Sequence, residues 1–476
     1  MFTDKDVNIY MVGIKGVGMA MLAQFLSSKG FNVSGSDVEE EFQTDKTLSN
    51  AKIKVKHGFS LNNFPGKIDL VIRSSAFDVK KNIELKFLAK RGFKIVTYAE
   101  ALGSLFDSYF GISVCGSHGK TTVTSWLGHV LNVAKLEPNV LSGSYVRQFK
   151  GSSLIGKSKY FIVESDEYQN KLQYFNPRAV ILNNIDFDHP DYFKNEKEYV
   201  KVFADFIKKI PSNGFIVFNG EDKLATKVSL KSKSRLVSYF IDKNYVKEGV
   251  GHKIYQAKNI KTKKAGQSFS LYRNNRKISD FDISLMGRHN VLNSLAVIAA
   301  SFEMNVPLDS LKRGLKSFNG ASRRFDVLGS YKGAVVVDDY AHHPREVKAC
   351  LDAVKQKYPK KKIICVFHPH TISRTKAFLN EFAESFSVCD SLFLLEIYTS
   401  AREKTGKLSS LDLLDKIKQY NLSAGINQDL KYFKDMVEVE NELRNMADSD
   451  KVFLLLGAGD VFRIAYKLLN INSSNI

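Results

Sequence analysis

A strand, a glycine loop and a helix follow one another at residues 109–131, and this unit constrains the fold more than any other stretch. The apolar run Gly111–Cys115 leads into "GSHGKTT", and a helical pattern leaves the loop at Lys120. Strands that enter a glycine loop and continue as a helix are typical of parallel α/β sheets. The sequence therefore predicts an α/β protein with a ligand site at this loop.

The loop departs from the usual spelling of a phosphate-binding loop. Four residues normally separate its two glycines, whereas here only two lie between Gly116 and Gly119. A capped helix start would explain the threonines that follow, but not two glycines together with Lys120. The lysine ammonium and the Thr121 hydroxyl suit a nucleotide phosphate and its Mg²⁺. We predict nucleotide binding by the whole loop, which comprises Gly116, Ser117, His118, Gly119, Lys120, Thr121 and Thr122.

The chain of 476 residues is too long for one hydrophobic core, and its strand–helix pattern restarts twice. Between residues 235 and 285 the pattern is shorter, alternating and polar, which predicts an antiparallel insert. We expect three α/β domains. They are an N-terminal Rossmann-like domain over residues 1–108, a central P-loop ATPase-like domain over 109–322 and a C-terminal Rossmann-like domain over 323–476.

The composition and the charge of the chain limit the classes of function that it can have. The net charge of +20 fits nucleic-acid binding, but the basic residues are scattered, and small polyphosphate substrates suit a basic surface equally well. No apolar stretch approaches the roughly 18 residues of a membrane helix. The four cysteines form no Cys-x-x-Cys pair, which argues against a disulfide framework or a zinc site. We expect a cytoplasmic protein that binds neither nucleic acid nor membrane.

A second glycine loop, "GIKGVGM", follows the apolar strand Val7–Val12. Its glycines, Gly13, Gly16 and Gly18, have a permuted form of the dinucleotide-binding spacing. Backbone N–H groups at the following helix start would cradle a diphosphate. Asp37 ends the next predicted strand, where such folds often contact a ribose or a base. A simple tight turn and NAD binding are the alternatives for this loop.

Carboxylates follow the predicted strand in "KYFIVESDEY". Glu164 comes directly after four apolar residues, and Asp166 and Glu167 lie just beyond it. Mg²⁺ prefers hard oxygen ligands, so Glu164 and the Thr121 hydroxyl suffice to predict a magnesium site. The alternative is a group of solvated acids at the end of a strand.

A histidine lies among carboxylates in "LNNIDFDHPDYF", which also follows a predicted strand. As the ligand of a second metal ion, His189 would need its other ring nitrogen held by a neighbour. Hydrogen bonding of His189 to Asp188 or Asp191 alone is the other interpretation.

Together these residues resemble the Mur ligase family of peptidoglycan precursor synthesis, whose phosphate loop has the short G-x-x-G-K-T form. The resemblance covers nearly the whole chain. Each motif is weak alone, but ten of them occur in the family's order. They are "VGIKGVGM", "SGSD", "GSHGKTT", "ESDEY", "NIDFDHPDYF", "GRHNVLNSLA", "SRRF", "DDYAHHPREV", "HPHTISRT" and "GAGD".

The resemblance implies an ATP-dependent amide ligation with Mg²⁺, and the motifs are most similar to the members that use L-alanine. ATP would phosphorylate the lactyl carboxylate of UDP-N-acetylmuramate, and the L-alanine amine would attack the acyl phosphate. A second member, which joins a whole tripeptide to UDP-N-acetylmuramate, is the alternative within the family. An NAD-dependent oxidoreductase and a nucleic-acid-binding ATPase are alternatives outside it, and both leave several motifs without a role. A monomer and a homodimer fit the sequence equally well.

The resemblance also implies a role for individual residues. The contacts to the UDP-sugar would come from Gly13, Gly16, Gly18, Asp37 and His118. The ligands of two Mg²⁺ ions would be Thr121, Glu164 and His189. Besides the phosphate loop, ATP would contact His289, Asn290, Asn293, Arg324 and Asp339. The pocket for the amino acid and the phosphate would contain His343, His370 and Arg374. Among these, the catalytic residues would be Lys120, His189, Arg324 and His343, with His343 as an acceptor for the amine proton.

Two positions depart from the family's pattern. Thr371 stands where many relatives have an arginine, so one phosphate contact would come from elsewhere. Phe203 stands where several sister ligases have a carbamylated lysine, which disfavours the ligases that add later amino acids.

Overall fold

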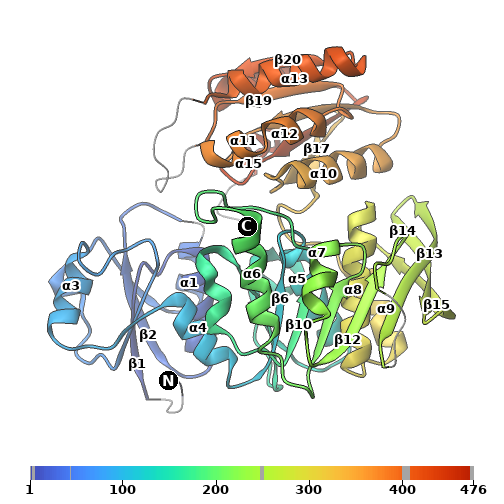
Figure 1. Ribbon diagram of the computed structural model, residues 1–476. Coiled ribbons are helices and arrows are strands. Elements are labelled where there is room, and N and C mark those ends of the chain that lie inside the picture. Colours follow the sequence, from blue (N-terminus) through green and yellow to red (C-terminus); the bar gives the residue numbers. More distant parts are fainter. Residues whose placement is uncertain (1, 3–5, 43, 247–250, 399–407, 472–476) are drawn as a thin grey trace.

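Three mostly parallel sheets follow one another along the chain in the computed structural model, as Figure 1 shows. The structure describes residues 2, 6–42, 44–246, 251–398 and 408–471. Helices cover the sheets, and the C-terminal sheet lies above the other two in Figure 1. The predicted α/β class with three domains is confirmed. We propose domain boundaries near residues 108 and 322, because β6 begins at Phe110 and β16 at Asp326.

The first sheet has the strand order β3-β2-β1-β4-β5, and all its described pairs are parallel. The order reverses between β1 and β4, which is where open parallel sheets bind ligands. The predicted strand–loop–helix unit is present, since β1 ends at Val12 and α1 begins at Val17. The elements are β1 (Asn8–Val12), α1 (Val17–Ser28), β2 (Asn32–Asp37), α2 (Thr44–Asn50), β3 (Lys54–His57), β4 (Leu70–Arg73), α3 (Ile83–Lys90), β5 (Ile95–Thr97) and α4 (Tyr98–Phe106).

The central sheet has ten strands in the order β15-β14-β13-β12-β11-β10-β6-β9-β7-β8. The prediction of an antiparallel insert over residues 235–285 is wrong in part. The strand β12 runs parallel to β11, and β13 runs parallel to β12, so only β14 and β15 add antiparallel pairs. The first part of this sheet contains β6 (Phe110–Cys115), α5 (Lys120–Val133), β7 (Asn139–Val146), β8 (Gly151–Leu154), β9 (Tyr160–Glu164), β10 (Ala179–Leu182), α6 (Glu196–Ile207), β11 (Phe215–Asn219) and α7 (Lys223–Ser229). The rest contains β12 (Arg235–Phe240), β13 (Lys253–Lys263), β14 (Gly266–Arg273), β15 (Arg276–Ile283), α8 (Arg288–Glu303) and α9 (Leu308–Ser317).

The C-terminal sheet has the order β16-β17-β21-β18-β19-β20, so the last strand of the chain lies in its middle. Among the described strand pairs of this sheet, only β16 and β17 are antiparallel. Its elements are β16 (Asp326–Tyr331), β17 (Ala334–Asp339), α10 (Pro344–Lys357), β18 (Lys362–Phe367), α11 (Ile372–Ala377), α12 (Leu379–Ser385), β19 (Ser391–Leu395), α13 (Ser410–Ala424), β20 (Asp429–Phe433), α14 (Met436–Met446), β21 (Lys451–Leu456) and α15 (Phe462–Leu469).

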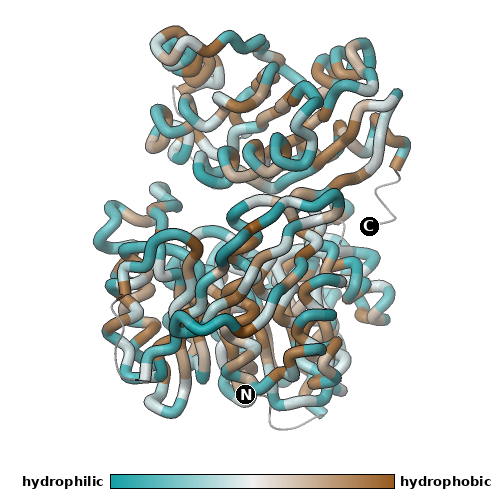
Figure 2. The backbone as a smooth tube through the Cα atoms, turned by 90° about the vertical axis from the view of Figure 1, so that its right-hand side faces the viewer, coloured by the Kyte–Doolittle hydropathy of each residue, from teal (hydrophilic) through white to brown (hydrophobic). Residues whose placement is uncertain are grey.

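The first two sheets share one hydrophobic core, whereas the C-terminal sheet has cores of its own. Phe25 of α1 stacks on Phe161 of β9 with ring centroids 5.0 Å apart. In Figure 2 the hydrophobic segments run through the interior of the upper and lower parts of the molecule. Among the described residues, no helix is both long and apolar enough to cross a bilayer.

Candidate active site

The phosphate-loop candidate lies at the carboxyl end of β6, as predicted. Gly116 and Gly119 have φ values of 123° and 78°, a region that favours glycine. A Cβ atom on Gly116 would lie 2.7 Å from the backbone oxygen of Asn184. The short loop is therefore held against the segment that follows β10, and its two glycines are required by backbone geometry as well as by close packing.

Lys120 begins α5 and turns its ammonium back towards the loop. Its Nζ lies 2.7 Å from the backbone oxygen of Gly116 and 3.0 Å from Oε2 of Glu167. Burial lowers the pKa of Lys120, but the charges of Glu167, Asp166 and Glu164 outweigh burial and raise it. The structure thus places a charged ammonium at the loop. The Lys120 side chain is only 15% exposed.

Thr121 and Glu164 meet beside the loop. The Thr121 hydroxyl donates to Oε1 of Glu164 over 2.9 Å, and the backbone N–H of Gly143 donates to Oε2 over 2.6 Å. Arg324 reaches across from the start of the C-terminal domain, with Nη2 3.4 Å from the Thr121 hydroxyl. The Thr121 hydroxyl and the Glu164 carboxylate, both hard oxygen donors, therefore lie close to the Arg324 guanidinium of another domain.

A second group of metal-ligating side chains lies close by. The ligand atoms of Asp166, Glu167 and His189 all lie within 4.8 Å of one another. Glu167 is buried and also accepts a hydrogen bond from the Tyr199 hydroxyl over 2.9 Å. Nε2 of His189 lies 3.7 Å from Glu167 and 3.9 Å from Asp188. This group combines oxygen and imidazole ligands of the kind that hold a divalent cation.

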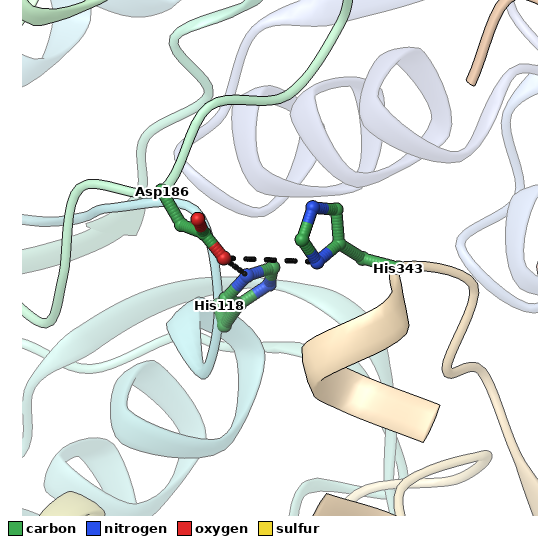
Figure 3. A group of neighbouring side chains, drawn as sticks. All are labelled: His118, Asp186 and His343. Atoms are coloured by element: carbon green, nitrogen blue, oxygen red, sulfur yellow. Dashed lines mark hydrogen bonds and ion pairs between the residues drawn. The ribbon is translucent and has the colours of Figure 1, made fainter. Parts of the chain in front are cut away.

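His118 joins the central and C-terminal domains. Its Nε2 lies 3.0 Å from Asp186 and its Nδ1 3.0 Å from Glu346, the third residue of α10. Figure 3 shows His118, Asp186 and His343 facing one another, with His343 at the start of that helix. Burial lowers the pKa of His118, but the two carboxylates outweigh burial and raise it to about 9. Burial and the charge of His118 lower the pKa of His343 to about 4.

Two cavities meet at the phosphate loop. One, of about 210 Å³, lies between the central and C-terminal domains and is lined by His289, Asn290, Asn293, Arg324 and Asp339, among others. The other, of about 470 Å³, extends from Gly16 and Gly18 to Lys120, Glu164 and His189. Gly119, Arg324 and Glu346 line both cavities.

The smaller cavity carries polar atoms without partners. Oδ1 of Asn183 and Nε of Arg324 are buried and have no hydrogen-bond partner among the described residues, and both residues line the cavity. Unpaired buried polar atoms are costly in a folded protein. Burial lowers the pKa of His289 to about 4, so its ring is neutral at pH 7. These features fit a ligand with hydrogen-bonding groups and an uncharged aromatic part.

Three family models match consecutive parts of the chain. The Mur ligase family, catalytic domain, matches residues 8–110; the Mur ligase middle domain matches 114–301; and the Mur ligase, glutamate ligase domain, matches 323–459. The UDP-N-acetylmuramate–L-alanine ligases of Clostridium acetobutylicum and Clostridium kluyveri are each 37% identical, and the match covers 98% of this chain and of theirs. The chain belongs to the Mur ligase family. The predicted resemblance is confirmed.

A solved structure shows the same fold in another Mur ligase. The UDP-N-acetylmuramate–alanine ligase of Thermotoga maritima has a TM-score of 0.78 and 24% identity, covering 97% of this chain and 98% of that one. A murein peptide ligase of Psychrobacter arcticus has a TM-score of 0.69 and 22% identity, covering 99% of both chains. These likenesses extend over all three sheets of the present Mur ligase.

The structure brings most of the predicted site residues of this Mur ligase to the two cavities. Seven of the predicted site residues line neither cavity: Gly13, Asp37, Gly116, Thr121, His343, His370 and Arg374. Asp37 is buried, and its carboxylate accepts the backbone N–H groups of Lys15 and Val38. His370 stacks on Tyr398 with centroids 5.4 Å apart. The Nε atom of Arg374 donates a hydrogen bond to Asp188 over 2.9 Å.

Sequence reasoning missed several residues of the site. Glu346 binds His118 and lines both cavities, yet in the sequence it is only an acidic residue in the first turn of a helix. Asp186 lies within the motif "NIDFDH", in which the sequence analysis gives a role only to Asp188 and His189. Asn183, just before that motif, lines the smaller cavity. The signal in the sequence is a strand end followed by several polar residues. That stretch includes Asn183 and Asp186 as well as Asp188 and His189.

We expect His118→Gln to flatten the pH dependence of stability between pH 6.5 and 9. A pKa raised from 6.5 to about 9 stabilises the folded state fully below pH 6.5, and that stabilisation, about 3 kcal/mol, is lost as pH rises through 9. The measurement is the urea midpoint of both proteins from pH 6 to pH 10. Parallel curves would show that His118 is not held in its charged form.

Proposed function

We propose that this Mur ligase joins L-alanine to the lactyl carboxylate of UDP-N-acetylmuramate, as a UDP-N-acetylmuramate–L-alanine ligase in peptidoglycan precursor synthesis. ATP transfers its γ-phosphoryl group to the carboxylate, and the alanine amine then displaces phosphate to form the amide. ADP, phosphate and one proton are released. The observation that carries the proposal is the 37% identity to ligases of this name over 98% of both chains.

The two cavities suit the two large substrates. We assign ATP to the cavity of about 210 Å³, where His289, Asn290 and Asn293 surround the base. We assign the UDP-sugar to the cavity of about 470 Å³, which begins at Gly16 and Gly18. A carboxylate and a triphosphate repel one another, so we assign Lys120, which lines the larger cavity, and Arg324, which lines both, to offset that charge.

The oxygen ligands beside the loop fit Mg²⁺. Thr121 and Glu164 would hold one ion, and His189 a second one with Asp166 or Glu167. Bound Mg²⁺ would neutralise charge on the phosphates during transfer. The protein's own residues orient these ligands, since Gly143 fixes one oxygen of Glu164 and Tyr199 fixes one of Glu167.

We propose that His343 receives the proton of the alanine amine. Its Nε2 is buried and has no hydrogen-bond partner among the described residues. A pKa of about 4 leaves the ring neutral at pH 7, but it also makes His343 a weak base. The proton would therefore pass on quickly to solvent.

The proposal is tested by measuring ADP release with ATP, Mg²⁺ and UDP-N-acetylmuramate while amino acids are added one at a time. Turnover that depends on both UDP-N-acetylmuramate and L-alanine is expected. Turnover with the tripeptide in place of L-alanine would identify the tripeptide ligase instead. ATP hydrolysis without dependence on the UDP-sugar would overturn the proposal.

We expect Glu164→Gln to raise the Mg²⁺ concentration needed for half-maximal rate by about tenfold or more, because a neutral amide is a poorer ligand for a hard cation. The measurement is a magnesium titration of ligation at saturating substrates. Glu303→Gln is a control, since the Glu303 carboxylate is also paired, with Lys253, but lies away from both cavities. An unchanged magnesium requirement in Glu164→Gln would remove Glu164 from the metal site.

We also propose that the enzyme works in the cytoplasm, as a monomer or a homodimer. Its four cysteines are buried and unpaired in the structure, which suits a reducing compartment, and ATP is its substrate.

A further inference from the structure

A buried lysine lies within the glycine loop of the first domain. Lys15 stands between Gly13 and Gly16, and its side chain is fully buried, with 0% of its surface exposed. It has no role in the chemistry proposed above and lines neither cavity. A charged ammonium in that position is costly unless all its hydrogens are paired.

The surroundings of Lys15 satisfy its ammonium completely. A lysine ammonium has three donors, and Nζ lies 3.0 Å from the backbone oxygen of Val38, 2.9 Å from that of Glu40 and 3.1 Å from Nδ1 of His57. The Asp45 carboxylate, 3.6 Å away, balances the charge. The three acceptors therefore lie beyond the carboxyl end of β2 and at the end of β3.

The backbone of Lys15 is tied to the same region. Its N–H donates to the Asp37 carboxylate over 2.6 Å, and its carbonyl accepts a hydrogen bond from the Thr44 hydroxyl. Backbone and side chain together thus hold the glycine loop against residues 37–42 and 44–45. That chain leaves β2 at the carboxyl edge of the sheet, beside the strand that carries the glycine loop.

In parallel α/β sheets the loop after the first strand holds the diphosphate, and the end of the second strand faces the nucleoside. The segment after β2 also carries Phe42, a residue that is 44% exposed and whose ring has the Lys15 ammonium 5.8 Å from its centroid. An exposed aromatic ring offers an apolar surface to a base. We propose that Lys15 is a positioning residue that fixes this segment as the wall of the nucleoside end of the UDP-sugar site. The inference rests on the proposed function, which places the UDP-sugar in this domain.

A fixed wall lowers the entropy lost when the ligand binds. Without the ammonium, the backbone oxygens of Val38 and Glu40 lose their shared donor, and the segment can leave the glycine loop. The affinity for the UDP-sugar should then fall, while the affinity for ATP should not, because ATP binds between the other two domains. Simple loss of folded protein would instead lower the fraction of binding sites without changing either dissociation constant.

The test is calorimetric titration of UDP-N-acetylmuramate and of ATP into the full-length protein and into Lys15→Met. We expect the dissociation constant of UDP-N-acetylmuramate to rise about tenfold or more, with that of ATP unchanged. Lys29→Met is the matched control, because Lys29 also donates to a backbone carbonyl, that of Gly156, but at the far end of α1. It should leave both constants unchanged.

Thr44→Val is a second variant in case Lys15→Met does not fold. It removes only the hydroxyl that binds the Lys15 carbonyl, and it should weaken UDP-N-acetylmuramate binding in the same direction by a smaller factor. Unchanged UDP-N-acetylmuramate binding in folded Lys15→Met, or in Thr44→Val where only that variant folds, would overturn the inference about Lys15. Absence of binding to the unaltered protein would instead overturn the proposed function.

Discussion

Replacing Lys120 with alanine is expected to slow ligation by about 100-fold or more while the protein stays folded. Lys120 lines the larger cavity next to Gly119, which lines both cavities, and the loss of one preorganised cation aimed at a transferring phosphoryl group costs on the order of 10²-fold in rate. The measurement is the rate of ADP release at saturating UDP-N-acetylmuramate, L-alanine and Mg²⁺.

The control for this variant must also remove the lysine partner of a buried carboxylate, because Lys120 pairs with the buried Glu167. Lys253→Ala does so, since Lys253 lies 2.6 Å from Glu303, whose side chain is only 2% exposed. Each carboxylate keeps a weaker partner, His189 at 3.7 Å from Glu167 and Arg235 at 3.6 Å from Glu303. Both variants should lose some stability, but only Lys120→Ala should lose activity at a temperature where both are folded. A rate within a few-fold of the parent would remove Lys120 from phosphate binding.

The parallel sheets could be predicted because their signal is local. Each of β1, β6 and β9 is an apolar run that ends in a loop or a carboxylate, and buried parallel strands are apolar along their whole length. Pairing is not local. The polar alternation of residues 235–285 resembles antiparallel hairpins, yet β12 pairs in parallel with β11 because the central sheet continues past it.

The same distinction explains which parts of the site were predicted. Glycine loops and strand-end acids are recognisable from neighbouring residues, and the structure brings Lys120, Thr121 and Glu164 together. Glu346 and Arg374 contact the central domain only because the C-terminal domain docks on it. Their partners, His118 and Asp188, are far away in the sequence, so no local pattern connects them.

The interfaces also indicate which domain can move. Phe25, Phe106 and Phe161 belong to one apolar cluster shared by the first two sheets, and separating them would expose that surface to water. The C-terminal domain contacts the centre through ion pairs and hydrogen bonds, such as those of His118 and Arg374. Polar interfaces of this kind permit relative motion. We therefore expect substrate-driven closure to involve the C-terminal domain, not all three domains equally.

The largest effect on that docking is expected from Arg374→Met. Arg374 on α11 pairs with Asp188 after β10 over 2.9 Å, and each side chain is only 6% exposed. Burial raises the pKa of Asp188, but the Arg374 guanidinium and nearby histidines outweigh burial and hold it well below its usual range. Removing the arginine takes away the main partner of a buried carboxylate, which costs about 3–5 kcal/mol.

Two further variants separate this effect from the mere loss of an ion pair between domains. Arg147 pairs with Asp326 across the same two domains, but Arg147 is 59% exposed, so Arg147→Met should cost less than about 1 kcal/mol. The double variant Arg374→Met, Asp188→Leu should recover most of the lost stability, because no unpaired charge is left behind. Urea midpoints of all variants measure the stability, and small-angle scattering measures docking. If Arg374→Met costs no more than Arg147→Met, the buried pair does not hold the C-terminal domain in place.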